Sequence, residues 1–426
     1  MTIVRAIRDG LQSFATRLGT GQDKAVTASY ALNMLDDQQL EAAFRTSWVC
    51  RKIVMVPSLD ATRRWRQWTG DDAKKVEELE DNQRIRLRAK VQEAHWQARL
   101  FGGAAILIGT PDADFAEPLD PSSIGLGGLR YLAVLSRQDL TGGIVEDDPR
   151  QALFGKPRYY EVQTAARGLF RVHPSRLVVF EGERLPRWNT GGGYVYGWGD
   201  SVLQSTYEAA RNLDSTMANV ASLVFDAKTD IVKIQGLSQN ISDPAYEEAL
   251  VRRFGTARLI KGNHGTLILD AEEEYESKSY TFSGLDKIAD RFMQVAAGAA
   301  DIPMTRLLGA SPGGLNSSGE GDLANYYDRV ASIQTLEIEP ALTTLDEVLM
   351  RSALGGIPDR LTYEWRPLRQ MTELQRSELR HRDAQTVKEL AASLVYSDEA
   401  VAAVGAQMFQ ETGIDALAHE APEGEE

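Results

Sequence analysis

Two long helical patterns, separated by a mixed segment, constrain the fold of this chain more than any other feature. The first begins at Asp200-Ser201, where Ser201 and Gln204 form a capping-box pattern, and continues to about Lys228. Its apolar residues keep a helical period: Leu203, Tyr207, Ala210, Leu213, Met217, Val220 and Val224. At about 1.5 Å per residue, this helix would be ~40 Å long. The second pattern begins at Ser283 and is stopped by Pro303; its apolar face comprises Leu285, Ile288, Phe292, Val295 and Ala299.

The segment between these helices, residues 229–282, has the pattern of a small α/β insert. We predict a strand at Asp230–Ile234 and a helix from Asp243 to Phe254. Two further strands are predicted at Leu259–Lys261 and Thr266–Leu269.

The part of the chain before residue 200 is predicted to be a loosely ordered arm, 1–30, followed by an α+β domain, 31–200. A core-like stretch, Trp48–Val56, is closed by Pro57, and a helix begins at about Asp72. The second half of that helix carries an apolar face, Leu87, Val91, Ala94 and Ala98, and ends at Gly102-Gly103. Strands are predicted at Ala104–Ile108, Tyr131–Leu135, Arg158–Val162 and Leu177–Phe180.

The part after Pro303 is predicted to begin with a loop, 303–319, and to continue as a long helix. A second capping-box pair, Ser317 and Glu320, opens this helix, which runs past Leu349 with Pro340 inside it. An interior proline removes one backbone hydrogen bond, so a kink is expected close to Pro340 within the region 320–369. A strand at Leu361–Trp365, helices over 370–413 and an acidic, disordered tail at 414–426 complete an α+β fold.

Composition narrows the possible functions. Lys and Arg number 47 against 61 Asp and Glu, which gives a net charge of −14. A protein that coats nucleic acid would normally carry a basic surplus, because phosphate neutralisation drives nonspecific affinity. The single cysteine, Cys50, excludes an intrachain disulfide and a multi-cysteine zinc site. We also predict no signal peptide and no membrane span, hence a protein of a reducing cytoplasm.

Several catalytic patterns are present only in part, so we predict no catalytic residue, no cofactor and no metal. Gly309-Ala310-Ser311-Pro312-Gly313 matches the nucleophile elbow of serine hydrolases, but Pro312 has no N–H for the oxyanion hole. A phosphate-binding loop is missing, since Gly155-Lys156 is followed by Pro157. The histidines have no metal-binding spacing, and acidic clusters such as Glu146-Asp147-Asp148 lack the pattern of a calcium loop.

Two other segments stand out. In Arg63, Arg64, Trp65 and Arg66, arginine surrounds tryptophan, which suits either a local ion-pair cluster or an interface with bases or an acidic neighbouring subunit. The second segment, 310–319, is uncharged and lies between two strong helices, a setting in which a flexible loop is often functional.

Several motifs together resemble the portal proteins of tailed bacteriophages. The strongest are Asp301–Gly309, Ser311–Glu320 and Asn325-Tyr326-Tyr327-Asp328. Supporting matches extend over nearly the whole chain: Ser47-Trp48 with Ile53-Val54 and Pro57, Asp60-Ala61-Thr62-Arg63 with Trp65-Arg66, His173–Arg176, Trp198–Ser201 and Tyr363–Leu368.

The resemblance implies a homo-oligomeric ring, usually a dodecamer, at one vertex of the virion capsid, assembled in the host cytoplasm. It implies an outer wing at 31–200, stem helices at 201–228 and 283–302, a clip at 229–282 and a crown at 370–413. The channel loop within 303–319 would comprise Ser311, Pro312, Gly313, Gly314, Leu315, Asn316, Ser317 and Ser318. Implied partners are the terminase large subunit, head–tail adaptors, capsid and scaffold proteins, and the double-stranded DNA that passes during packaging and ejection.

Physical chemistry agrees with that reading of the loop. DNA that a motor drives must not be held, and each phosphate–cation contact adds salt-dependent affinity. A wall of Gly, Ser, Asn and Pro with one apolar residue, Leu315, offers no such contacts.

Two alternatives are kept beside the portal. One is a hydrolase or phosphodiesterase acting on nucleotides, since some portal-like chains carry fused enzymatic segments. A pair of spaced His-x-Ser/Thr motifs, or carboxylates with metal spacing, would favour it, and we expect neither. The other is a different head–tail connector ring, which the helix–insert–helix pattern fits poorly.

Overall fold

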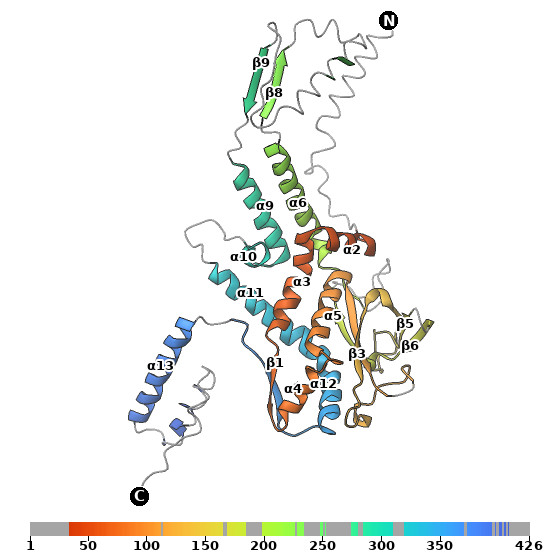
Figure 1. Ribbon diagram of the computed structural model, residues 1–426. Coiled ribbons are helices and arrows are strands. Elements are labelled where there is room, and N and C mark those ends of the chain that lie inside the picture. Colours follow the sequence, from red (N-terminus) through yellow and green to blue (C-terminus); the bar gives the residue numbers. More distant parts are fainter. Residues whose placement is uncertain are drawn as a thin grey trace.

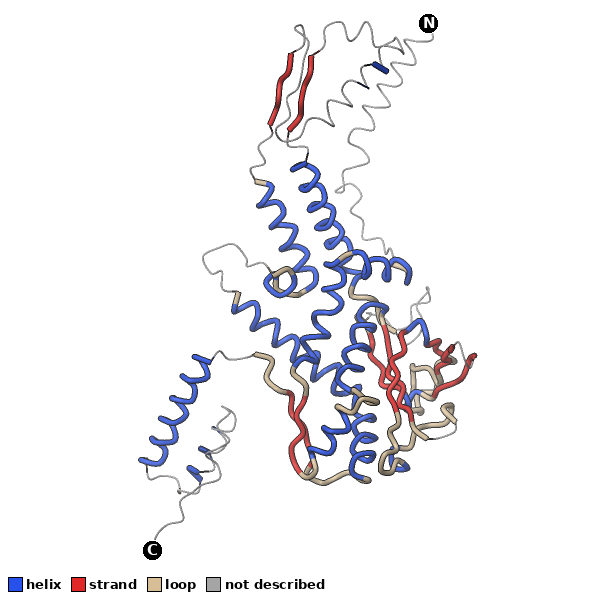
Figure 2. Tube along the Cα trace, viewed as in Figure 1, coloured by secondary structure: helices blue, strands red, loops and turns tan. Residues whose placement is uncertain are grey.

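The computed structural model describes residues 34–111, 114–164, 168–184, 198–225, 228–233, 274–279, 284–309, 319–369 and 373–393, with a few isolated positions in 248–252 and 397–408. These residues form a mixed α/β body from which two helices, α6 (Leu203–Phe225) and α9 (Leu285–Ala300), project (Figure 1). Figure 2 shows that the sheets lie mainly on one side of the body and that helices make up its centre. The predicted arm at 1–30 and tail at 414–426 lie outside the described residues.

The first two helices, α2 (Asp37–Thr46) and α3 (Trp48–Arg63), meet at Ser47. The Ser47 hydroxyl accepts a hydrogen bond from Cys50 N (3.2 Å) and donates one to Asp214 on α6 (2.6 Å). The core-like stretch that begins at Trp48 was predicted to end at Pro57. This prediction is wrong, because α3 continues through Pro57 to Arg63. Proline supplies no N–H to the carbonyl four residues earlier, that of Ile53. Arg99 donates there instead, to Ile53 O (3.1 Å) and Val54 O (3.2 Å), so the helix continues without a buried orphan carbonyl.

The single helix predicted from Asp72 is two helices, α4 (Ala73–Glu80) and α5 (Leu87–Phe101). The chain turns between them, and Arg86 takes a left-handed conformation with φ of 44°. The apolar face predicted for α5 is confirmed, since its four predicted residues are fully buried. Gly102 ends α5 at φ 85°, where a Cβ would meet Gly199 O at 2.2 Å, so glycine is required.

Three antiparallel sheets complete the body. In the first, the wholly buried β2 (Gly103–Gly109) lies between β3 (Tyr131–Ser136) and β7 (Leu177–Glu181). The second sheet contains β4 (Leu140–Gly142), β5 (Tyr160–Thr164) and β6 (Gly168–Val172). The third pairs β1 (Arg66–Gly70) with β10 (Leu361–Trp365). Strands β2, β3, β5, β7 and β10 were predicted from the sequence, whereas β1, β4 and β6 were not. The body also contains three short 3₁₀ helices, Pro121–Ser123, Arg137–Asp139 and Pro174–Arg176.

The two projecting helices pack against each other and lead to a strand pair, β8 (Lys228–Lys233) and β9 (Glu274–Ser279), at their far end (Figure 1). Helices α6 and α9 begin within two residues of the predicted positions. Strand β8 matches the prediction closely, whereas β9 was not predicted. The other two predicted strands of the insert lie outside the described residues, as does most of its predicted helix.

The long helix after the loop changes its hydrogen-bonding pattern just before Pro340, and the predicted kink stays a prediction. Helix α11 (Glu320–Ile333) passes into one π-helical stretch, Gln334–Ile338, and then into α12 (Glu339–Leu354). Pro340 therefore lies in the first turn of α12, where its missing N–H costs little. Gly319, at φ 61°, precedes the first residue of α11 as its N-cap, so the predicted cap at Ser317 is wrong. Helix α13 (Glu373–Ala392) follows β10.

Of the four residues in the arginine–tryptophan segment, Trp65 and Arg66 lie in a buried ion-pair cluster. Arg66 is 3% exposed and donates to Glu80 (2.7 and 3.0 Å) and to Asp346 Oδ2 (2.6 Å). Trp65 Nε1 donates to Glu80 as well (2.8 Å), and the Arg66 guanidinium lies 4.4 Å from the ring centroid of Tyr363. For these two residues the interface interpretation is wrong, because the cluster joins four elements of one chain. Arg63 and Arg64 remain partly exposed.

Candidate functional site

The candidate site is the structure that holds the two ends of the segment 310–318. The eight predicted channel-loop residues, 311–318, lie outside the described residues. The described flanks are 301–309, with the short helix α10 (Met304–Leu307), and 319–329 at the start of α11. We call these two flanks the loop frame.

A buried carboxylate, Asp60 on α3, ties the two flanks together. Arg306 on α10 donates to both of its oxygens, with Nε at 2.9 Å and Nη2 at 2.7 Å. Tyr326 on α11 donates its hydroxyl to Oδ2 at 2.9 Å. Asp60 is completely buried, so one side chain fixes the position of α10 relative to α11. The hydrogen bond to Asp60 raises the pKa of Arg306 above its usual value, and burial, with Asp60 nearby, raises that of Tyr326.

Further contacts fasten the frame to the body. Lys52 on α3 donates to Leu307 O at 2.7 Å, at the end of α10. Arg63 donates to Leu368 O (3.0 Å), and its guanidinium lies 5.1 Å from the ring centroid of Tyr327. Each flank is therefore anchored at several points on α3, which makes the frame rigid on both sides of the segment it holds.

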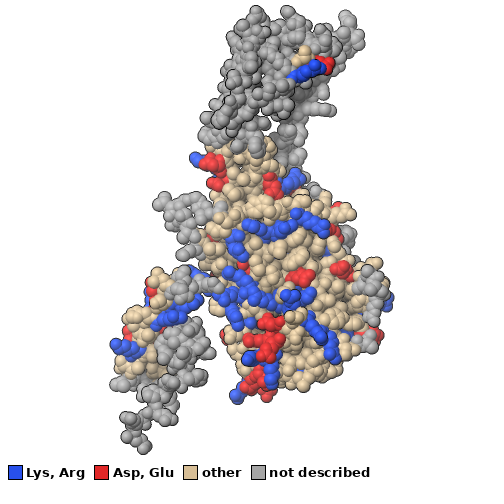
Figure 3. Space-filling view, viewed as in Figure 1, with Lys and Arg blue, Asp and Glu red and all other residues tan. Residues whose placement is uncertain are grey.

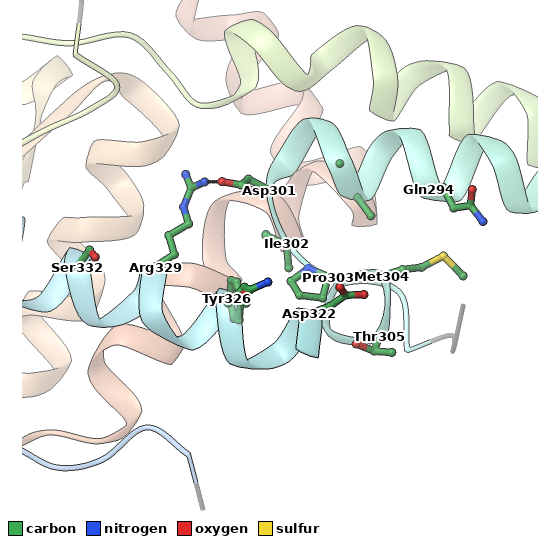
Figure 4. Close-up of a pocket in the computed structure, with 13 residues that line it drawn as sticks. Gln294, Asp301, Ile302, Pro303, Met304, Thr305, Asp322, Tyr326, Arg329 and Ser332 are labelled. Carbon is green, nitrogen blue, oxygen red and sulfur yellow. Dashed lines mark ion pairs between the residues drawn. The ribbon is translucent and has the colours of Figure 1, made fainter. Parts of the chain in front are cut away.

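A cavity of about 680 Å³ adjoins the frame between α9, α10 and α11 (Figure 4). Asp301, which ends α9 at φ 54°, forms an ion pair across it with Arg329 of α11. Gln294, Thr305 and Asp322 line its other walls, and Thr305 Oγ1 is buried without a hydrogen-bond partner. The frame thus borders a hollow that both polar and apolar residues line.

The structural context of the nucleophile-elbow motif differs from that of a hydrolase. The motif needs a strand before the serine. Here the residues before Gly309 form α10, and Gly309 itself takes a left-handed φ of 74°. Ser311 lies outside the described residues, so nothing in the described part of the chain supports a nucleophile there.

The histidines of the body are bonded within it. His95 is buried and shares a hydrogen bond with Ser58 (2.7 Å) through Nδ1, while Nε2 lies 3.4 Å from Glu337. Burial lowers the pKa of His95 below its usual value, which favours the neutral ring. Across the residues described here, no three His, Cys, Asp or Glu side chains gather as a metal site would require, and no helix is long and apolar enough to span a bilayer.

The expectation that the chain has no pair of His-x-Ser/Thr motifs is wrong. Two such triplets occur, His173-Pro174-Ser175 and His264-Gly265-Thr266. In the first, His173 Nδ1 accepts from Ser175 N (3.2 Å) and contacts its hydroxyl (2.8 Å), so the ring caps a 3₁₀ turn. The second triplet lies outside the described residues.

Known proteins resemble this chain in both structure and sequence. The neck of an empty gene transfer agent particle, solved with C6 symmetry, contains a chain with a TM-score of 0.51 and 16% identity, covering 89% of this chain and 97% of that one. The chain therefore shares its fold with that chain of the particle neck. The sequence matches the family described as phage portal protein over residues 38–389, and the chain belongs to that family.

Two curated relatives carry a protein name that differs from the name of the family. Proteins named Anti-CBASS protein Acb1 from Sphingomonas paeninsulae and a Caulobacter species are 38% and 39% identical over 97% and 90% of this chain. The chain spans only about two thirds of their length, 67% and 63%. An uncharacterized protein of Haemophilus influenzae is 33% identical over 85% of this chain and 81% of its own.

The sequence analysis missed the residue at the centre of the frame. Asp60 was quoted among the family motifs but was given no role, because its burial appears only in the fold. It lies in the helical stretch Ser58–Thr62, where four of the five residues are fully buried or nearly so. A carboxylate in such a position needs cationic or hydroxyl partners, and Arg306 and Tyr326 both belong to the strongest family motifs.

Changing the frame should affect stability in a graded way. We expect Asp60→Asn to lower the free energy of unfolding by roughly 2–3 kcal/mol, because charge-assisted hydrogen bonds are lost. Tyr326→Phe removes only one hydrogen bond and should cost about 1–2 kcal/mol. Urea denaturation of both variants measures the difference, and equal, negligible losses would contradict the role given to Asp60.

Proposed function

We propose that this protein is a portal that forms a homo-oligomeric ring at one capsid vertex and acts as a conduit for DNA packaging and ejection. The observation that carries the proposal is the family match over residues 38–389. A dodecamer is the proposed working state. The proposed role involves no catalysis, cofactor or metal.

The projecting helices support assembly into a ring. Beyond Leu213, the described residues of α6 are at most partly buried, yet many are apolar, among them Met217 and Leu223. On α9, Ile288 and Val295 are about half exposed. The two helices cover each other on one side only. The apolar side chains that stay exposed on them are suited to packing between neighbouring copies. We therefore propose that α6 and α9 are the stem helices.

The other domain assignments are proposed on the same basis. Residues 31–200 would form the wing, 229–282 the clip, 303–319 the channel loop and 370–413 the crown. The clip would contact the terminase large subunit and later a head–tail adaptor. Capsid and scaffold proteins would surround the ring, and double-stranded DNA would pass through it. The protein would act in the virion after assembly in the host cytoplasm.

The rigid frame supports the channel-loop assignment in particular. A loop that meets moving DNA must be compliant, whereas its ends must transmit force to the ring. The sequence of 310–318 carries no charge, and its flanks are fixed by Asp60, Lys52 and Arg306.

A second candidate function comes from the name of two relatives, Anti-CBASS protein Acb1. About a third of each of those proteins lies outside the stretch that matches this chain. For this reason we keep a nucleotide-directed hydrolase as the alternative. Of the two His-x-Ser/Thr triplets, the one at His264 lies outside the described residues, so its surroundings do not count against this alternative. Turnover of nucleoside phosphodiester substrates by the purified protein, abolished by His264→Ala, would favour it.

Sedimentation of the purified protein tests the portal proposal. At micromolar concentration and physiological salt, most of the protein is expected to sediment as a large closed assembly, because identical interfaces that close a ring are favoured by mass action. A single species near the chain mass of 47.0 kDa over a wide concentration range would count against the proposal.

A further inference from the structure

One face of the body carries a concentration of positive charge that the net charge of the chain conceals. Figure 3 shows Lys and Arg in a band across the body over α3 and α5. We call these residues the basic band; it comprises Arg51, Lys52, Arg63, Arg64, Arg84, Arg86 and Arg88, all partly or fully exposed. Only Arg63 has a carboxylate within 4 Å among the described residues, the buried Asp60. A face of this kind suits an anionic partner.

Large apolar side chains lie within the same face. Trp48 is 51% exposed and Leu59 is 42% exposed, and with Arg51 and Met55 they recur at helical spacing along α3. The Lys52 ammonium lies 5.2 Å from the ring centroid of Trp48. A stripe of aromatic, apolar and basic side chains resembles the buried centre of a protein interface, which is enriched in Trp, Met and Arg.

A second face carries hollows with an excess of carboxylates. The cavity beside the loop frame shares Arg329 and Ser332 with another of about 720 Å³ between α5, β7 and the π-helical stretch. Together their walls contain Asp301, Asp322, Glu181, Glu183 and Glu337 against Arg99, Arg184 and Arg329. Leu336, 68% exposed, adds an apolar contact. We call this face the acidic hollow.

The basic band and the acidic hollow are separate surfaces that share no residue. The basic band over α3 faces the viewer in Figure 3. A closed ring uses one heterologous interface, in which one surface of each subunit meets a different surface of the next. Opposite charge on two different surfaces suits such an interface.

We propose that the basic band of one copy docks on the acidic hollow of the next copy. This inference rests on the proposed ring and specifies which surfaces close it. The exposed Trp48 and Leu59 favour another copy of the protein over nucleic acid, because Leu59 gains nothing from a phosphate backbone, whereas Leu336 and the walls of the hollow offer apolar surface.

Charge reversal on each side, and on both sides together, tests the proposal. The band variant is Arg51→Glu with Arg64→Glu, and the hollow variant is Asp322→Lys with Glu183→Lys. Each alone should reduce the ring fraction by roughly tenfold or more at about 0.15 M salt, because every interface of the ring repeats the mismatch. The variant with all four changes should recover most of the ring, since an acidic band then meets a basic hollow.

Two controls make the result decisive. Arg130→Glu with Arg150→Glu makes the same change of charge at exposed positions outside the band and should leave the ring intact. Thermal unfolding shows whether each variant folds. If the wild type forms no ring, the proposed function fails. If the wild type forms rings and both single-side variants do too, the docking proposal is overturned while the portal stands.

Two further outcomes would also overturn it. In the first, each single-side variant has lost the ring, and the four-site variant folds but forms no ring either. The other is a band variant that keeps its ring but no longer retains double-stranded DNA, which would make the band a nucleic-acid surface.

Discussion

Replacing Arg66 with leucine is expected to lower the free energy of unfolding by about 3–5 kcal/mol, the usual cost of removing one partner from a buried ion pair. The substitution leaves Glu80 and Asp346 buried without their cation. It also removes the guanidinium between the rings of Trp68 and Tyr363. Burial already raises the pKa of Asp346, against the opposing effect of Arg66, so loss of the arginine should favour protonation of that carboxyl group.

A matched control lies two residues away. Arg64→Ala removes a partly exposed arginine and should change stability by less than about 0.5 kcal/mol. Arg66→Lys keeps the charge but loses the two-sided contact with Glu80 and Asp346, so an intermediate loss is expected. Chemical denaturation of all three variants gives the free energy of unfolding of each and so ranks their stabilities. Equal stability of Arg66→Leu and Arg64→Ala would contradict the structural role of the cluster.

Replacing Gly313 and Gly314 with isoleucine is expected to leave ring assembly normal and to impair DNA packaging severely. Glycine permits backbone conformations that β-branched residues cannot adopt, so the substitution stiffens the proposed channel loop. The anchors of the frame, Asp60 and Arg306, are untouched, and assembly should therefore persist. Packaging of DNA into capsids in vitro measures the effect.

Lysine at Asn316 and Ser317 should impair packaging in a different way. A ring would place many new cations around the duplex, and these would retain DNA more strongly at low salt than at high salt. If packaging recovers as the salt concentration rises, the defect is retention of DNA. If it does not recover, the defect resembles that of the stiffened loop. Wild-type packaging by both sets of variants at low salt would mean that this loop does not face the DNA.

Elements with strong local patterns were predicted well. The apolar face of α5, the buried strand β2 and the helices α6 and α9 each carry a period or an apolar run that few other structures accommodate. The family motifs include the residues that flank 310–318 and also Asp60, to which no role was given.

Features that depend on distant partners were not predicted. In the sequence, Pro57 indicates the end of a helix. In the fold, Arg99 from α5 donates to the Ile53 carbonyl, which the proline leaves without its usual N–H donor. Strand β1 is short and contains arginine and glutamine, and it is a strand because it pairs with β10 nearly three hundred residues away. The charge of Arg66 gave no sign of burial, since its two carboxylate partners lie on α4 and α12.

Electron microscopy of the purified protein tests the central claim most directly. We expect turbine-shaped rings with a central hole, formed by copies of this chain alone, with α6 and α9 in the narrow stem. Single particles of one chain, or closed assemblies without a central channel, would contradict it.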